Sequence, residues 1–175
     1  MAEFAVTGHA SRASEKFSIP GRAQMSESVR ATAADAQLIL QLYEMRREEV
    51  MRKARHFAVF EFWPQDIQDL TRITSNPAST ENQYLRQVVS YWEMAAALVL
   101  RGALHEELFY DTCGELYFMY AKFKPFIHSL REGSPEFMQN CERLVTQSPA
   151  GRARVERIEK NLAKRMAADP GKSVH

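Results

Sequence analysis

The chain of 175 residues carries a formal net charge of +1, with 45% hydrophobic and 26% charged residues. This balance is typical of one globular domain, and the length allows a substantial buried core. The near-neutral charge excludes a strong overall attraction to nucleic acid or to an anionic membrane, so such binding would need a local basic patch.

Cysteine usage and hydropathy favour a cytoplasmic protein without a membrane span. The two cysteines, Cys113 and Cys141, form no C-x-x-C pair, and a secreted disulfide scaffold would need more of them. The longest strongly apolar run, residues 94–100, is much shorter than the roughly twenty residues that cross a bilayer. The first residues also lack the pattern of a signal peptide.

The apolar periodicity divides the chain into three parts. Residues 1–30 are rich in Ser, Ala, Arg and Glu, their apolar residues follow no period, and we predict a disordered tail. Residues 31–168 are predicted to form a single helical domain. Residues 169–175 are predicted to be a short flexible C-terminus.

The first half of the domain has clear helical signals. Apolar residues at helical spacing, including Tyr43, Met45 and Val50, predict one helix from about residue 32 to residue 57, with these side chains in the core. Pro64 suits the first turn of a short second helix. A capping box at residues 80–83 predicts the start of a long helix that ends at Gly102.

In the second half, an apolar stripe from Phe109 to Leu130 keeps its register across Pro125, which predicts one kinked helix or two helices nearly in line. Residues 134–136 have the composition of a helix start, and this helix should reach about residue 147. Residues 149–151 separate it from the last helix. Because no run alternates as a strand would, we predict an all-α antiparallel bundle of five or six helices without a sheet.

Candidate acidic residues lie in the middle of the chain. Glu93 follows Trp92 inside an apolar helix, where Trp92 belongs to the core stripe and Glu93 to a second, polar stripe. A solvated or ion-paired face is the favoured interpretation of Glu93, and a carboxylate inside the bundle is the alternative. In that alternative Glu93, Asp111, Glu115 and His128 would share a central pocket.

The stretch at residues 105–111 contains four metal-ligand residue types, but their spacing is poor. Glu107 and Asp111 are four apart, whereas His105 is expected to precede the helix, and the Glu-x-x-His signature of di-iron bundles is absent. Acidic residues in a first helical turn are also favoured by the helix dipole. We therefore predict no metal and no cofactor, and we expect both cysteines to be core residues.

The last helix carries a basic stripe. Its cationic members are Arg154, Arg157, Lys160, Lys164 and Arg165. A solvated face with i,i+4 ion pairs is the favoured interpretation. A weak contact with nucleic acid or with a protein partner is the alternative.

Three short motifs carry a resemblance to a known family. They are W-E at residues 92–93, G-x-L-x-E-E-L at residues 102–108 and Y-D-x-x-G at residues 110–114. The sequence resembles a bacterial all-helical domain family of unknown function over about residues 35–135. The resemblance implies an all-α fold and provides no catalytic residue. Family members often follow a membrane-anchoring helix, which is not found in this sequence.

The aromatic and methionine content bears on function. Ten Phe, six Tyr and eight Met provide more apolar helix surface than a small core needs, and such a surplus often marks an interface. We therefore expect a non-catalytic module that binds a protein partner or a second copy of itself. The alternative is a ligand-binding or enzymatic bundle that uses the acidic pocket.

Overall fold

The computed structural model describes residues 30–168, with side chains up to residue 164. Within this range the chain is all-α and contains no strand, which confirms the predicted fold class. The predicted disordered tail, apart from Arg30, and the predicted flexible C-terminus lie outside the described residues. The elements are α1 (Ala33–Met45), α2 (Glu49–His56), the π-helix η1 (Phe57–Glu61), α3 (Ile67–Thr74), α4 (Thr80–Leu100), α5 (Glu106–Thr112), α6 (Gly114–Phe123), the 3₁₀ helix η2 (Lys124–Phe126), α7 (Ile127–Gly133), α8 (Gln139–Gln147) and α9 (Pro149–Ala168).

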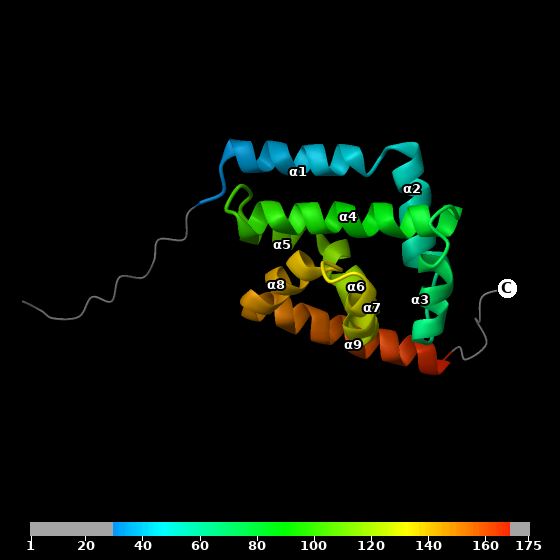
Figure 1. Cartoon of the computed structure of the whole chain (residues 1–175). Coiled ribbons are helices and arrows are strands. Elements are labelled where there is room, and N and C mark those ends of the chain that lie inside the picture. Colours follow the sequence, from blue (N-terminus) through cyan, green and yellow to red (C-terminus); the bar gives the residue numbers. More distant parts are fainter. Residues whose placement is uncertain (1–29, 169–175) are drawn as a thin grey trace, which may run out of the picture.

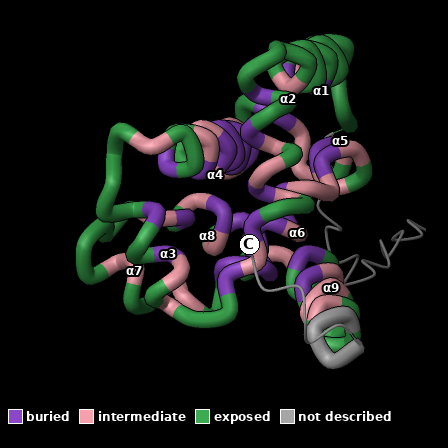
Figure 2. Tube along the Cα trace, turned by 90° about the vertical axis from the view of Figure 1, so that its right-hand side faces the viewer, coloured by how far each residue is buried: buried purple, intermediate pink, exposed green. Residues whose placement is uncertain are grey.

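The long helix α4 is the centre of the arrangement (Figure 1). It packs against α2 and η1 on one side and against α8 on another, while α9 covers α6 and α8. Figure 2 shows that α4 is largely buried whereas α1 is largely exposed. Helix α1 therefore lies on the surface of the bundle and contributes only Ile39 and Leu42 to the core.

Trp92 occupies the centre of the core, as the apolar stripe of α4 predicts. Its side chain is fully buried, and its ring makes edge-to-face contacts with Tyr91 and Phe109 at centroid distances of 4.8 and 6.5 Å. Because Phe109 belongs to α5, this contact joins α4 to the segment that follows Gly102. Gly102 has a φ of 70°, the left-handed conformation that commonly follows the end of a helix.

The first predicted helix is wrong in one respect, because the chain breaks it after Met45. The Glu48 carboxylate accepts a hydrogen bond from the Met51 amide at 2.8 Å and starts α2 as a new helix. The break turns Met45 and Val50 out of the predicted core, where they are 49% and 47% exposed, and Tyr43 is 41% exposed. The helical spacing of apolar residues in the sequence does not predict such a corner.

Further helix starts differ from their predicted positions. Pro64 is not in a first helical turn, because the Asp66 side chain caps α3 and this helix begins at Ile67. The N-cap of α4 is Ser79, one residue before the predicted Thr80, because the Ser79 hydroxyl accepts a hydrogen bond from the Asn82 amide at 3.1 Å. Helix α9 begins at Pro149, and Gly151 lies inside it. A β-carbon on Gly151 would lie 2.9 Å from the Val145 carbonyl oxygen, so this glycine permits the close approach of α8 and α9.

The apolar stripe from Phe109 to Leu130 is divided between three helices. Cys113 adopts a non-helical conformation and separates α5 from α6. Pro125 lies in η2, which separates α6 from α7. The predicted helix start at Ser134 is also wrong, since residues 135–138 form turns and α8 begins at Gln139.

Among residues 30–168, no helix combines the length and the apolar character that a crossing of the bilayer requires. The longest helix, α4, has polar and charged residues along its length, including Arg86 and Glu93.

Candidate functional site

Glu93 binds to the N-terminus of α8. Its two carboxylate oxygens accept hydrogen bonds from the backbone amides of Asn140 at 3.0 Å and Cys141 at 2.9 Å. These amides have no partner within their own helix, and a carboxylate at this position also interacts favourably with the helix dipole. Glu93 therefore does not lie free on a polar face. It acts as the N-terminal cap of a helix that is distant in sequence.

Glu115 is the centre of a partly buried ion cluster. Its carboxylate lies 2.9 Å from Arg46 Nη2 and also accepts hydrogen bonds from Arg55, with Arg55 Nε at 2.9 Å from Oε1. The Glu115 side chain is only 13% exposed. The hydrogen bond from Arg55 to Glu115 raises the pKa of Arg55, so this guanidinium stays charged. Glu115 thus joins α6 to the corner between α1 and α2.

The Arg46 guanidinium of this cluster also lies against aromatic rings. It is 5.0 Å from the Tyr43 ring centroid and 5.3 Å from that of Trp92. The Tyr43 hydroxyl donates a hydrogen bond to the Thr112 carbonyl at 2.7 Å. Side chains at the end of α1 therefore position the corner against α4, α5 and α6.

The other two predicted acidic-pocket residues, Asp111 and His128, are exposed. No hydrogen bond or ion pair described for residues 30–164 joins any two of Glu93, Asp111, Glu115 and His128. The structure therefore assigns a structural contact to two of the four residues and leaves the other two at the surface.

His105 precedes α5, as the sequence predicts, and is its N-cap residue. Its Nδ1 accepts a hydrogen bond from the Leu108 amide at 3.2 Å, and its own amide donates one to Asp35 at 2.8 Å. Glu106 and Glu107 lie in the first turn, where the helix dipole stabilises them. Residues 30–164 contain no group of three or more His, Cys, Asp or Glu side chains that is placed to hold a metal ion.

Both cysteines are buried, which confirms their expected place in the core. Burial raises the pKa of the Cys113 thiol. Burial and the nearby Glu93 carboxylate raise the pKa of the Cys141 thiol well above its ordinary value. Both side chains therefore remain neutral thiols and poor nucleophiles.

The predicted basic face of α9 is smaller than its sequence suggests. Arg157, Lys160 and Lys164 are exposed, whereas the side chain of Arg165 lies outside the described range. Arg154 is partly buried, because it precedes the inward-facing Ile158 by four residues and so borders the apolar face of α9.

Arg154 instead fastens α9 to the rest of the domain. Its guanidinium lies 4.7 Å from the Tyr110 ring centroid and 5.0 Å from that of Tyr117, and it donates a hydrogen bond to the Tyr110 carbonyl. A β-carbon on Gly114 would lie 2.8 Å from Arg154 Nη2, so a larger residue at this position would require the guanidinium to shift. Tyr110 and Gly114 are the first and last residues of the Y-D-x-x-G motif.

Lys122 is a buried residue that sequence reasoning missed. Its ammonium group donates a hydrogen bond to the Ala58 carbonyl at 2.8 Å and lies 4.0 Å from the Trp63 ring centroid. The local sequence does not reveal this burial, because Lys124 lies in the same run of aromatic residues at 117–126 and is exposed.

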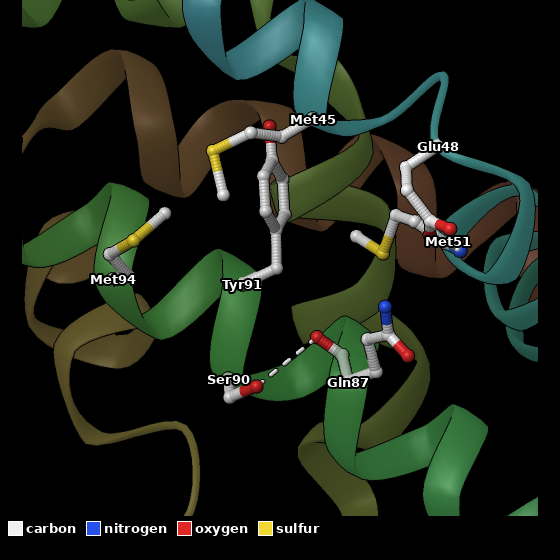
Figure 3. Close-up of a pocket in the computed structure, with 7 residues that line it drawn as sticks. All are labelled: Met45, Glu48, Met51, Gln87, Ser90, Tyr91 and Met94. Carbon is white, nitrogen blue, oxygen red and sulfur yellow. Dashed lines mark hydrogen bonds between the residues drawn. The ribbon is translucent and has the colours of Figure 1, made fainter.

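A hollow with a volume of about 510 Å³ lies between α4 and the corner between α1 and α2 (Figure 3). We call it the methionine groove. It is lined by Met45, Glu48, Met51, Gln87, Ser90, Tyr91 and Met94. In Figure 3 the Tyr91 ring stands between the Met45 and Met94 side chains on one side and Met51 on the other.

The α4 wall of the groove is a regular helix face. Its lining residues at positions 87, 90, 91 and 94 are spaced i, i+3, i+4 and i+7, which places them on one side of the helix. The Tyr91 hydroxyl donates a hydrogen bond to the Leu42 carbonyl at 2.8 Å and holds its ring in place. Burial raises the pKa of Tyr91, so the phenol remains neutral.

The α1–α2 wall is apolar and acidic. Met45 is 49% exposed and Met94, opposite it, is 38% exposed. A second hollow continues along α1 and is lined by Gln41, Glu44, Met45, Arg47 and Glu48. Hydrogen bonds from the Met51 and Val50 amides lower the pKa of Glu48, so this carboxylate stays ionised. None of the four predicted acidic-pocket residues lines the methionine groove.

A comparison with protein families matches residues 31–148 to a family described as a domain of unknown function, DUF4760. No curated protein and no solved structure matches the chain. The matched residues include α1 to α8 and every residue of the methionine groove, and they end before α9. This result confirms the resemblance to a helical family of unknown function. Since the match covers more than half of its residues, the chain belongs to the DUF4760 family.

Proposed function

We propose that the domain is a non-catalytic protein-interaction module and that the methionine groove binds its partner. The supporting observation is the pair of half-exposed thioethers, Met45 and Met94, on opposite walls of a hollow. Exposed apolar clusters of this kind often mark binding surfaces. Methionine is flexible and polarisable, and it is over-represented at surfaces that accept varied partners.

The alternative, a catalytic or ligand-binding acidic pocket, has less support. Glu93 is occupied by two backbone amides and Glu115 by two arginines. A general acid or base must reach a substrate proton, and these carboxylates are engaged in contacts that hold helices together. The buried, neutral thiols also support a structural role and suit the reducing cytoplasm in which we place the domain.

The size of the groove favours a segment of a partner protein over a second copy of the domain. A stable interface between two globular proteins buries about 800 Å² on each side, whereas volumes of about 300–1,000 Å³ suit a ligand or a few inserted side chains. The groove, with about 510 Å³, falls in this second range.

Cross-linking from two matched positions tests the proposal. A photoreactive amino acid replaces Met94 in one protein and Leu40 in the other, because Leu40 is 69% exposed and lies outside the groove. In cells that naturally express the chain, we expect one protein to cross-link from position 94 and not from position 40.

The cross-linked protein is then purified, and its affinity for the chain and for two variants tests whether the groove is the binding site. We expect Met94→Glu to weaken binding at least about tenfold, and Leu40→Glu to leave it unchanged. Equal losses in both variants would overturn the proposal. A concentration-dependent dimer that Met94→Glu abolishes would replace the partner by a second copy of the chain.

A further inference from the structure

We infer that the occupant of the methionine groove is an amphipathic helix of a partner protein with lysine or arginine along one edge. This inference rests on the proposed function and adds the shape and charge of the partner.

The length of the groove supports a helical occupant. The lining residues of α4 run from Gln87 to Met94, and seven residues of helix extend over about 10 Å, or two turns. A helix packed along such a face contributes apolar residues at i, i+3 or i+4, and i+7. The methionine side chains leave the choice of these apolar residues open, because thioethers adapt to different shapes.

The two walls of the groove differ in charge. On the α1–α2 side, Glu48 lines the methionine groove, and Glu44 lines the second hollow together with Arg47, with which it forms an ion pair at 3.6 Å. Two carboxylates and one guanidinium leave this wall with a net charge of −1. On the α4 side, the polar lining residues are Gln87 and Ser90, which are uncharged. The negative charge therefore lies on one wall. Complementary charge fixes orientation and selects partners, so the basic edge of the occupant should face α1 and α2.

The basic helix of a second copy does not meet these requirements. Helix α9 has exposed cations, but its apolar face is already in use within its own domain, with Val155 buried there. Arg154 is also held between Tyr110 and Tyr117. Helix α9 of a second copy is therefore not the occupant that we infer.

Two synthetic helical peptides of about 15 residues test the charge of the occupant. Both have leucines at i, i+3 and i+7, and one carries lysines along a single edge where the other carries glutamates. Fluorescence anisotropy measures their binding to the full chain. We expect the lysine peptide to bind about fivefold more tightly than the glutamate peptide, and Glu44→Lys to remove or reverse this preference.

Glu136→Lys is the matched control, because it makes the same charge change at an exposed residue that lines neither hollow. It should leave the preference for the lysine peptide intact. Met94→Glu should weaken the binding of the lysine peptide.

The outcomes separate the two proposals. Equal binding of the two peptides, with both sensitive to Met94→Glu, would overturn the inferred charge and leave the groove as a protein-binding site. If neither peptide binds, or if binding ignores Met94→Glu, the helical occupant is overturned. The cross-linking from position 94 then decides the proposed function on its own.

Discussion

Two neighbouring residues of α4, Glu93 and Met94, reverse the usual rule for polar and apolar side chains. The carboxylate of Glu93 is bound to the start of α8, whereas Met94 is 38% exposed in a hollow. The polar side chain is thus engaged in a contact inside the protein, and the apolar side chain beside it is partly exposed to solvent. The exposed apolar surface supports the proposed binding role of the methionine groove, and the Glu93 carboxylate contributes to holding α8 in place.

The difference between the two faces of α4 follows from what covers them. The core face, which contains Trp92, Ala95 and Ala96, is fully buried, with Trp92 packed against Phe109 of α5. The groove face meets only the corner between α1 and α2, because α1 ends at Met45 and the chain turns there.

The strongest test of this comparison pairs Trp92→Ala with Met94→Ala. Trp92 is fully buried, so its truncation should lower the free energy of unfolding by about 3–5 kcal/mol. Met94 contributes to a hollow and is partly exposed, so its loss should cost less than about 1 kcal/mol. Urea denaturation measures both variants. Similar losses in the two would show that the faces do not differ as described.

Glu115→Gln tests whether the ion cluster around Glu115 stabilises the fold. The substitution leaves Arg46 and Arg55 together without their counter-charge in a partly buried place, and we expect a loss of about 2 kcal/mol. As a control, Glu49→Gln disrupts an exposed ion pair with Lys53 and should leave the urea midpoint unchanged. A silent Glu115→Gln would mean that the cluster does not hold the corner.

Glu93→Ala should have a smaller effect, because it removes a helix cap and exposes two backbone amides. Such losses cost about 1–2 kcal/mol. A solvated or ion-paired face, which the sequence favours for Glu93, would make this substitution nearly silent, whereas the contacts with α8 predict a loss of stability. Hydrogen exchange should accelerate at the amides of Asn140 and Cys141. Asp111→Ala, at an exposed residue, is the control and should change neither quantity.

The smallest expected effect is a loss of stability at alkaline pH. Burial raises the thiol pKa of Cys113 and Cys141 in the folded chain, so the unfolded chain loses these protons first. Their contribution to stability is therefore complete below about pH 8.5 and declines as the pH rises further. Urea midpoints between pH 8 and pH 10 should fall in the natural protein and fall less in Cys141→Ala. Identical slopes would contradict this assignment.

The parts of the fold that depend on local patterns are predictable from the sequence. The apolar stripe of α4 correctly places Trp92 in the core, and Gly102 marks the end of that helix. The corner after Met45 is harder to predict from the sequence, because Arg46 at this corner binds Glu115, which lies 69 residues later. The methionine groove could not be predicted from the sequence for the same reason. Met45 continues the apolar spacing of the predicted core, and only the turn at the corner exposes its side chain.

The cap on α8 has a consequence for the order in which the domain folds. Helix α8 has no side-chain cap of its own, follows Met138 in a left-handed conformation, and receives its cap from a residue 47 positions earlier. A nine-residue helix is marginal in isolation. Helix α8 should therefore become stable only after α4 has formed and the two have met. Kinetic φ-values should be higher in α4 than in α8, which places the assembly of this pair late in folding.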